Sequence, residues 1–127
     1  MQRRRVTNMF VAPAMIKRLV TSPEMGRYDL SSIRCLNYGG APIYEEDLKE
    51  AVRKMGQVFV QLFGQAESPM TITHLRKEEH LLEGTEEQMK RLTSAGIPRT
   101  AVEAKYLTQK TGSFPQGRWE RSWSGER

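Results

Sequence analysis

Two short turns that contain glycine are the part of this sequence most suited to chemistry. The first is Tyr38-Gly39-Gly40-Ala41-Pro42 and the second is Phe63-Gly64-Gln65-Ala66-Glu67. Glycine lets the backbone approach a flat ligand closely and adopt positive φ. Phe63 offers an aromatic face, and the carboxylate of Glu67 is an oxygen ligand of the kind that Mg²⁺ prefers. The pattern fits a nucleotide and metal site, and it also fits two ordinary turns, which glycine after a strand most often marks.

A second group of side chains has the chemistry of a metal site but not its spacing. The group is His74, Glu78, Glu79 and His80. No zinc-ligand pattern is met, so we expect an exposed polar loop there. Ser68 lacks the flanking glycines of a nucleophile elbow. Cys35 is interpreted as a small core residue within a strand.

The composition limits the chain to one small domain or a part of a larger one. It has 127 residues, of which 38% are hydrophobic and 28% charged, and a net charge of +5. Collagen, coiled-coil and disulfide-rich classes are excluded. The longest apolar run, residues 9–16, is interrupted by Pro13 and is too short to span a bilayer. A single cysteine and a poor match to a signal peptide indicate a cytoplasmic protein with no membrane span.

Basic residues near the start of the chain raise the question of nucleic-acid binding. The cluster is Arg3-Arg4-Arg5. A basic arm could contact phosphates, but no aromatic interleaving or RNA-binding signature accompanies it. We interpret the cluster as a solvated edge before the first strand and predict no nucleic-acid partner.

The elements that must position the two turns alternate between strand and helix. They are strands at residues 6–11, 33–38 and 58–62, with helices at residues 13–20 and 44–55 between them. This order predicts an α/β fold with a mostly parallel β-sheet and crossover helices. In such sheets ligands bind beyond the carboxyl ends of the strands, where both glycine turns fall.

Four further elements are predicted towards the C-terminus. They are a strand at residues 70–75, a helix at 85–92, a loop at 94–98 and an edge strand at 101–107. The helix is expected to open at Thr85 because Thr85 and Gln88 have the spacing of a capping box.

Four blocks of sequence carry a resemblance to a known family. They are residues 6–13 (VTNMFVAP), 36–42 (LNYGGAP), 58–71 (VFVQLFGQAESPMT) and 94–98 (SAGIP). In order and spacing they resemble the AMP-binding, adenylate-forming acyl-CoA synthetase family, which includes long-chain fatty-acid–CoA ligases. The resemblance implies that residues 1–105 are an internal fragment of that family, a partial AMP-binding α/β subdomain.

The resemblance also implies a reaction and a set of contacts. The family joins a fatty or other carboxylic acid to CoA through an acyl-adenylate, using ATP and Mg²⁺. The adenine and the acyl group would be bordered by Gly39, Gly40, Ala41 and Pro42. The second turn would supply further nucleotide contacts from Phe63, Gly64, Gln65 and Ala66, with Phe63 in place of the family's usual tyrosine. Glu67 would hold Mg²⁺, and Ala66 replaces a threonine whose hydroxyl contact is worth roughly 1.5–3 kcal/mol.

Other parts of the family's active site have no counterpart in this sequence. These are the phosphate loop that ends in lysine, the later aspartate that holds the ribose hydroxyls, and the C-terminal domain with its catalytic lysine. Because catalysis of this kind is mostly positioning and charge stabilisation, we expect no turnover from the chain alone. An incomplete subdomain also exposes a sheet edge, through which we expect self-association. The alternatives are a stand-alone nucleotide-binding or protein-interaction module and a subunit of a split synthetase.

Residues 106–127 do not resemble the family in the frame given. Back-translated and read in the frame in which each codon takes the last base of one codon and the first two bases of the next, a permitted choice of codons gives a string that contains Gly-Glu-Ile-Val-Val-Arg-Gly, as the family has at this point. We therefore hypothesise that one lost base changed the frame near Lys105 and that residues 106–127 are an out-of-frame, disordered tail. A genuine basic tail that binds a partner is the alternative.

Overall fold

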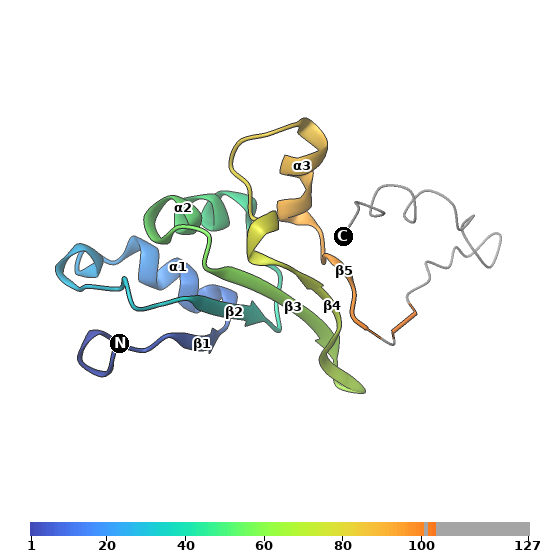
Figure 1. Cartoon of the computed structure of the whole chain (residues 1–127), viewed down its shortest axis with the longest axis horizontal. Helices are drawn as coiled ribbons and strands as arrows, with labels where there is room; N and C mark the ends of the chain where they lie inside the picture. The colour runs from blue at the N-terminus through green and yellow to red at the C-terminus, as the bar shows by residue number, and fades with distance from the viewer. Residues whose placement is uncertain (101, 104–127) are drawn as a thin grey trace.

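A five-stranded mixed β-sheet forms the centre of the protein. The computed structural model describes residues 1–100, 102 and 103. In spatial order the strands are β1 (Asn8–Val11), β2 (Cys35–Gly39), β3 (Phe59–Gln65), β4 (Ser68–Leu75) and β5 (Ile97–Pro98) (Figure 1). The first three run parallel to one another, whereas β4 is antiparallel to β3 and β5 is antiparallel to β4. The α/β fold with a parallel unit and crossover helices is confirmed, and the antiparallel strands make the whole sheet mixed.

Two crossover helices, α1 (Pro13–Thr21) and α2 (Glu45–Met55), pack against each other beside the parallel strands (Figure 1). Pro13 occupies the first turn of α1, where its missing N–H costs nothing. The first turn of α2 is acidic and its last turn is basic, as the helix dipole favours. Gly56 ends α2 with a φ of 76°. Local signals in the sequence therefore account for both helices.

One apolar cluster joins the helices to the sheet. Leu36 and Tyr38 of β2 and Phe59 of β3 are fully buried, and they pack in the same cluster as residues of both helices. The helical members are Ile16, Val20, Leu48, Ala51 and Val52. The opposite face of the sheet carries the alternate residues of each strand, among them Phe10, which is 53% exposed.

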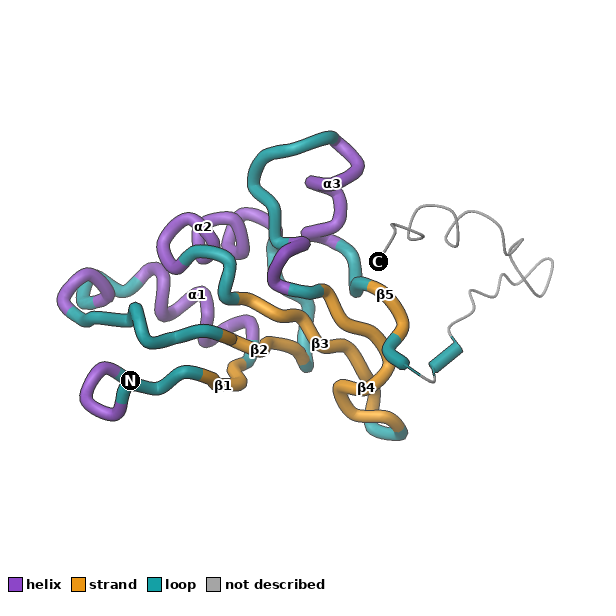
Figure 2. Tube along the Cα trace, viewed as in Figure 1, coloured by secondary structure: helices purple, strands orange, loops and turns teal. Residues whose placement is uncertain are grey.

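The predicted turn at residues 63–67 is wrong in its extent. The strand β3 continues through Gly64 to Gln65, and only Ala66 and Glu67 form the turn before β4 (Figure 2). Antiparallel pairing with β4 overrides the local turn signal of Gly64, and the register of the two strands shifts there. The functional candidates of the second block thus lie on a β-hairpin.

Short helical turns connect the remaining elements. They are η1 (Gln2–Arg4), η2 (Met25–Arg27), η3 (Lys77–Glu79), α3 (Glu86–Lys90) and η4 (Arg91–Thr93). The capping box that opens α3 is confirmed, since Thr85 Oγ1 accepts from the Gln88 amide and Gln88 Oε1 accepts from the Thr85 amide. The loop predicted at residues 94–98 is wrong in part, because its last two residues are β5, which pairs with β4.

Part of the predicted C-terminal organisation lies outside the described residues. Of the edge strand expected at residues 101–107, only residues 102 and 103 are described, and they are not in a strand. The tail at residues 106–127 lies wholly outside the described part of the chain. Within the described part, no helix is both long and apolar enough to cross a membrane.

Candidate functional site

The first glycine turn lies where the parallel strands end. Gly39 is the last residue of β2 and is paired with Leu62 of the neighbouring strand. Gly40 follows with a φ of 84°, in the region that favours glycine. Gly39 is buried, whereas Gly40, Ala41 and Pro42 are exposed. The turn therefore presents accessible backbone at the edge of the sheet where ligands bind in open parallel sheets.

The side chain of Met70, from β4, covers the two glycines. Cβ atoms built on Gly39 and Gly40 would lie 2.9 Å from Met70 Sδ and 3.5 Å from Met70 Cε, respectively. Met70 itself has a φ of 57°, which is uncommon for a residue with a side chain. Met70 is thus a wall of the candidate site that sequence reasoning missed, because only the hairpin register brings it over β2.

The second block lies on the hairpin formed by β3 and β4. Phe63 is 39% exposed and is paired with Thr73, and Gln65 is paired with Ser68. Gly64 has no room for a side chain, since an ideal Cβ would lie 2.1 Å from Met70 N. Ala66 and Glu67 are exposed at the tip. The structure therefore connects the two predicted turns through Met70, with the carboxylate of Glu67 free of ion pairs to other described residues.

The group of histidines and acidic residues is only partly the expected exposed loop. No group of three or more potential ligands lies together within the described residues. His80 is fully buried and Glu79 is 6% exposed, which corrects the prediction for both. His74 is half-buried in β4, and Glu78 alone is exposed. Burial of Glu79 and His80 follows from the turn η3, which folds back against β3.

A buried hydrogen bond joins His80 to Tyr38, the residue before the glycine turn. The hydroxyl of Tyr38 lies 3.0 Å from His80 Nε2, and His80 Nδ1 lies 2.9 Å from the carbonyl oxygen of Arg76. Because a carbonyl oxygen can only accept, Nδ1 carries the hydrogen and Nε2 accepts from the tyrosine. Burial lowers the pKa of His80 and raises the pKa of Tyr38, so both groups are neutral.

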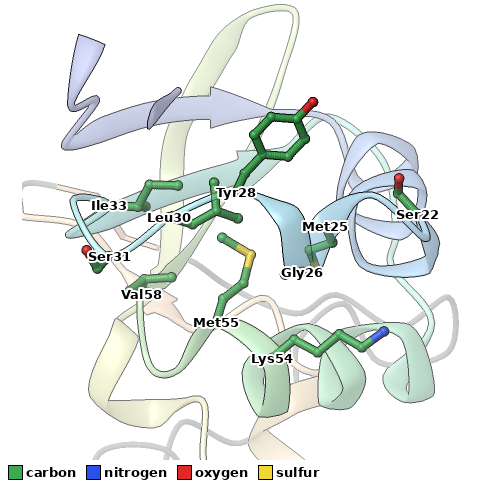
Figure 3. A pocket seen from close by; sticks show the side chains of 10 residues that line it. All are labelled: Ser22, Met25, Gly26, Tyr28, Leu30, Ser31, Ile33, Lys54, Met55 and Val58. Carbon is green, nitrogen blue, oxygen red and sulfur yellow. The ribbon is translucent and has the colours of Figure 1, made fainter. Parts of the chain in front are cut away.

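A separate cavity of about 690 Å³ lies at the amino ends of β2 and β3, away from the glycine turn at their carboxyl ends (Figure 3). Its apolar lining includes Met25, Leu30, Ile33, Met55 and Val58. Lys54, which also lines the cavity, forms a salt bridge with Glu50 and donates a hydrogen bond to a carbonyl oxygen of α1. None of the residues predicted for the nucleotide site contributes to this cavity.

The remaining single candidates have structural environments. Cys35 is the first residue of β2 and is half-buried, not fully in the core as predicted. Its thiol lies 3.7 Å from Asn37 Oδ1. Ser68 forms a hydrogen bond with Thr71 at the start of β4.

Comparison with known proteins decides the family. A family model described as AMP-binding enzyme matches residues 1–120. This chain belongs to the AMP-binding enzyme family. The matched range continues past Lys105, so the division of the chain at that residue stays a prediction.

Several family members are similar in sequence and in structure. The medium/long-chain-fatty-acid–CoA ligase FadD8 of Mycobacterium tuberculosis is 34% identical over 116 residues, which cover 91% of this chain and 19% of the relative. The fatty acid–[acyl-carrier-protein] ligase ScoC of Streptomyces coeruleorubidus is 30% identical over 112 residues, which cover 88% of this chain and 21% of the relative. The amide bond synthetase McbA of Marinactinospora thermotolerans superimposes with a TM-score of 0.78 at 32% identity, over 91% of this chain and 22% of that one. The chain thus spans about a fifth of the length of these family members.

Proposed function

We propose that this chain supplies part of the ATP and acyl site of an AMP-forming ligase that activates a fatty or other carboxylic acid for transfer to CoA. The observation that carries the proposal is the exposed glycine turn at the carboxyl end of β2, in a chain of the AMP-binding enzyme family. FadD8 and ScoC are named for fatty acids as substrates, with CoA and acyl carrier protein as the respective acceptors. Because the two relatives share the fatty acid but differ in the acceptor, they support the proposed acid substrate more strongly than the proposed acceptor, CoA.

The proposed roles are carried over from the family resemblance to the matching residues of this chain. Gly39 and Gly40 would border the adenine and the acyl group, together with Ala41 and Pro42. Phe63, whose ring is partly exposed, would stack near the adenine. Ala66 carries no hydroxyl, so the phosphate contact at this point of the hairpin is missing.

Glu67 fits one protein ligand of a hard divalent cation. Its carboxylate is exposed at the hairpin tip and forms no ion pair with another described residue. Mg²⁺ usually takes one or two carboxylates and completes its shell with phosphate oxygens and water. When bound, the ion would neutralise phosphate charge, and the part of Glu67 is to hold it near the hairpin.

We further propose that the chain is inactive alone and that it self-associates. The first point rests on the absence from the sequence of a phosphate loop and a catalytic lysine. The second rests on β1, which lies at one edge of the sheet, and on Phe10, which is 53% exposed on the face away from the helices. Sedimentation velocity should show association that Phe10→Lys abolishes and that Tyr44→Lys, at an exposed tyrosine beside α2, leaves unchanged.

Calorimetric titration with ATP, with and without Mg²⁺, tests the site. We expect binding that Mg²⁺ strengthens, loss of that strengthening in Glu67→Gln, and no change in the matched control Glu87→Gln, at an exposed carboxylate on α3. No pyrophosphate should be released when fatty acids are added. Absence of heat from a folded chain would overturn the nucleotide site, and steady turnover would overturn the proposed inactivity.

A further inference from the structure

His80 is fully buried, and it is not among the residues proposed to contact the ligand. It follows η3 and lies against β3, and its ring centroid is 5.8 Å from that of Tyr38 and 6.4 Å from that of Phe59. A polar ring in such a place costs free energy unless its nitrogens are paired. Both nitrogens are paired here, which gives the ring one orientation.

The two partners of His80 belong to different parts of the chain. Nδ1 donates to the carbonyl oxygen of Arg76, and the turn that holds Arg76 is closed by Glu79 Oε2, which accepts from the Arg76 amide at 2.9 Å. Nε2 accepts from Tyr38, which is 42 residues away in sequence. The imidazole is therefore a rigid bridge between the turn η3 and the end of β2.

Tyr38 links this bridge to the proposed ligand contacts. Its backbone continues directly into Gly39, whose environment has no room for a side chain, and then into Gly40 at a φ of 84°. Among the described residues, the hydroxyl has one other hydrogen-bonding neighbour, Gln61 Oε1, at the long distance of 3.5 Å. Core packing holds the ring of Tyr38, and the hydrogen bond to His80 is the shorter of the two that its hydroxyl can form.

We infer that His80 is a positioning residue for the glycine turn: acting through the Tyr38 hydroxyl, it holds the backbone of Gly39 and Gly40 in the arrangement that the nucleotide requires. The purpose assigned to the turn rests on the proposed function, whereas the coupling itself does not. Protonation of Nε2 would reverse this hydrogen bond, because the ring would then donate to the tyrosine oxygen and the hydroxyl hydrogen would need another acceptor, such as Gln61 Oε1 at 3.5 Å. The arrangement of the turn should therefore depend on the charge of His80.

The groups around His80 determine how readily it takes a proton. Burial lowers the pKa of His80 and outweighs the hydrogen bond to the Arg76 carbonyl and the charges of Glu79 and Glu78 on its own segment, which raise it. From the sheet, His80 faces Tyr38 and Phe59, neither of which is charged at neutral pH. The histidine is therefore neutral at pH 7 and takes a proton only in acid.

NMR of the ¹⁵N-labelled chain tests this coupling without a nucleotide. The chain has two histidines, so His74→Asn leaves His80 as the only imidazole to be titrated. In this background the amide shifts of Gly39 and Gly40 should change with the same midpoint as the His80 ring. Adding Tyr38→Phe, which keeps the ring and removes the hydroxyl, should abolish the change in the glycines while His80 still titrates. Glycine shifts that ignore His80, or that follow it equally in Tyr38→Phe, would overturn the inference.

Hydrogen exchange at pH 7 gives a second measurement that does not require acid. Exchange of the backbone amides around Gly39 and Gly40 should accelerate at least about fivefold in Tyr38→Phe and in His80→Leu. It should accelerate no further in the double variant, because both changes break one link. His80→Gln, which can still accept from Tyr38, should restore part of the protection. The amide of Gln88 in α3 is the internal control.

The outcomes separate the two proposals. If ATP does not bind but the glycine amides follow His80, the proposed function fails and the coupling stands. If ATP binds with equal affinity to the chain and to Tyr38→Phe, and the glycine amides are equally protected in both, the positioning role is overturned.

Discussion

A Cβ atom added to Gly39 would lie 2.2 Å from the carbonyl oxygen of Leu62, its partner in the parallel ladder. Real Cβ atoms do not approach a backbone oxygen this closely, so β2 and β3 can pair here only through glycine. Gly39 is thus required by the sheet before any ligand is considered. Gly39 therefore belongs to the candidate site and also allows β2 and β3 to pair.

Gly39→Ala should consequently be strongly destabilising. The added methyl group requires β3 to move away and the thioether of Met70 to shift as well. Overpacking costs about 1–3 kcal/mol, and a clash with backbone places this substitution at the upper end. Urea unfolding followed by circular dichroism measures the loss. The control is Gly26→Ala, because nothing lies within 4 Å of a Cβ at Gly26. An alanine at position 39 as stable as the wild type would contradict the close pairing.

Gly40→Ala should have a smaller and different effect. A Cβ there meets only Met70 Cε at 3.5 Å, an ordinary contact, but the φ of 84° is unfavourable for alanine. Left-handed backbone costs a residue with a side chain about 1–2 kcal/mol. The free energy of unfolding should fall by this amount, clearly less than for Gly39→Ala. A loss at position 40 as large as that at position 39 would contradict the ordinary contact found there.

The elements predicted well are those whose signals are local. The helix α2 needs only its apolar spacing, its acidic first turn and Gly56, and its observed bounds differ from the predicted ones by one residue. The turn predicted at Gly64 is wrong because antiparallel pairing with β4 outweighs a local preference. A pairing partner that lies later in the chain leaves no mark on the sequence at Gly64 itself.

The candidate site shows the same division. The glycine turn could be predicted because it follows a recognisable strand. Met70 could not be, since its place over Gly39 and Gly40 depends on the register shift within the hairpin. The burial of His80 depends equally on Tyr38, far away in sequence. The residues that line or support the site are therefore brought together by strand register and tertiary contacts, which the local sequence does not show.

Thr85→Ala tests the start of α3. The threonine hydroxyl accepts from the Gln88 amide at 3.2 Å, and removal of such an N-cap costs about 1 kcal/mol. We expect faster hydrogen exchange at the Gln88 amide together with a modest loss of unfolding free energy. Thr93→Ala, which removes a hydroxyl that donates to the Lys90 carbonyl at the other end of this segment, should leave the Gln88 amide unaffected. Equal effects of the two substitutions would show that the capping bond is not what protects α3.

The stability of the fold should fall as the pH is lowered from neutral. Burial lowers the pKa of His80 below its ordinary value of 6.5, so the unfolded chain binds a proton before the folded chain does. The contribution of His80 is fully present above pH 6.5 and is lost as the pH falls towards the pKa of the folded state. Urea unfolding between pH 7.5 and about 5 should therefore give a free energy that declines with acidity.

Substitutions of the histidines separate their contributions to this decline. The pKa of His74 is also lowered, by burial and by the nearby charges of Arg99 and Arg76, so it acts in the same direction. His80→Gln should flatten the dependence of the unfolding free energy on pH, whatever its effect at pH 7.5. His74→Gln should remove a separate part, since its ring does not share the hydrogen bond to Tyr38. A slope that His80→Gln leaves unchanged would mean that His80 has the same proton affinity in the folded and unfolded chain, in contradiction of its complete burial against Tyr38.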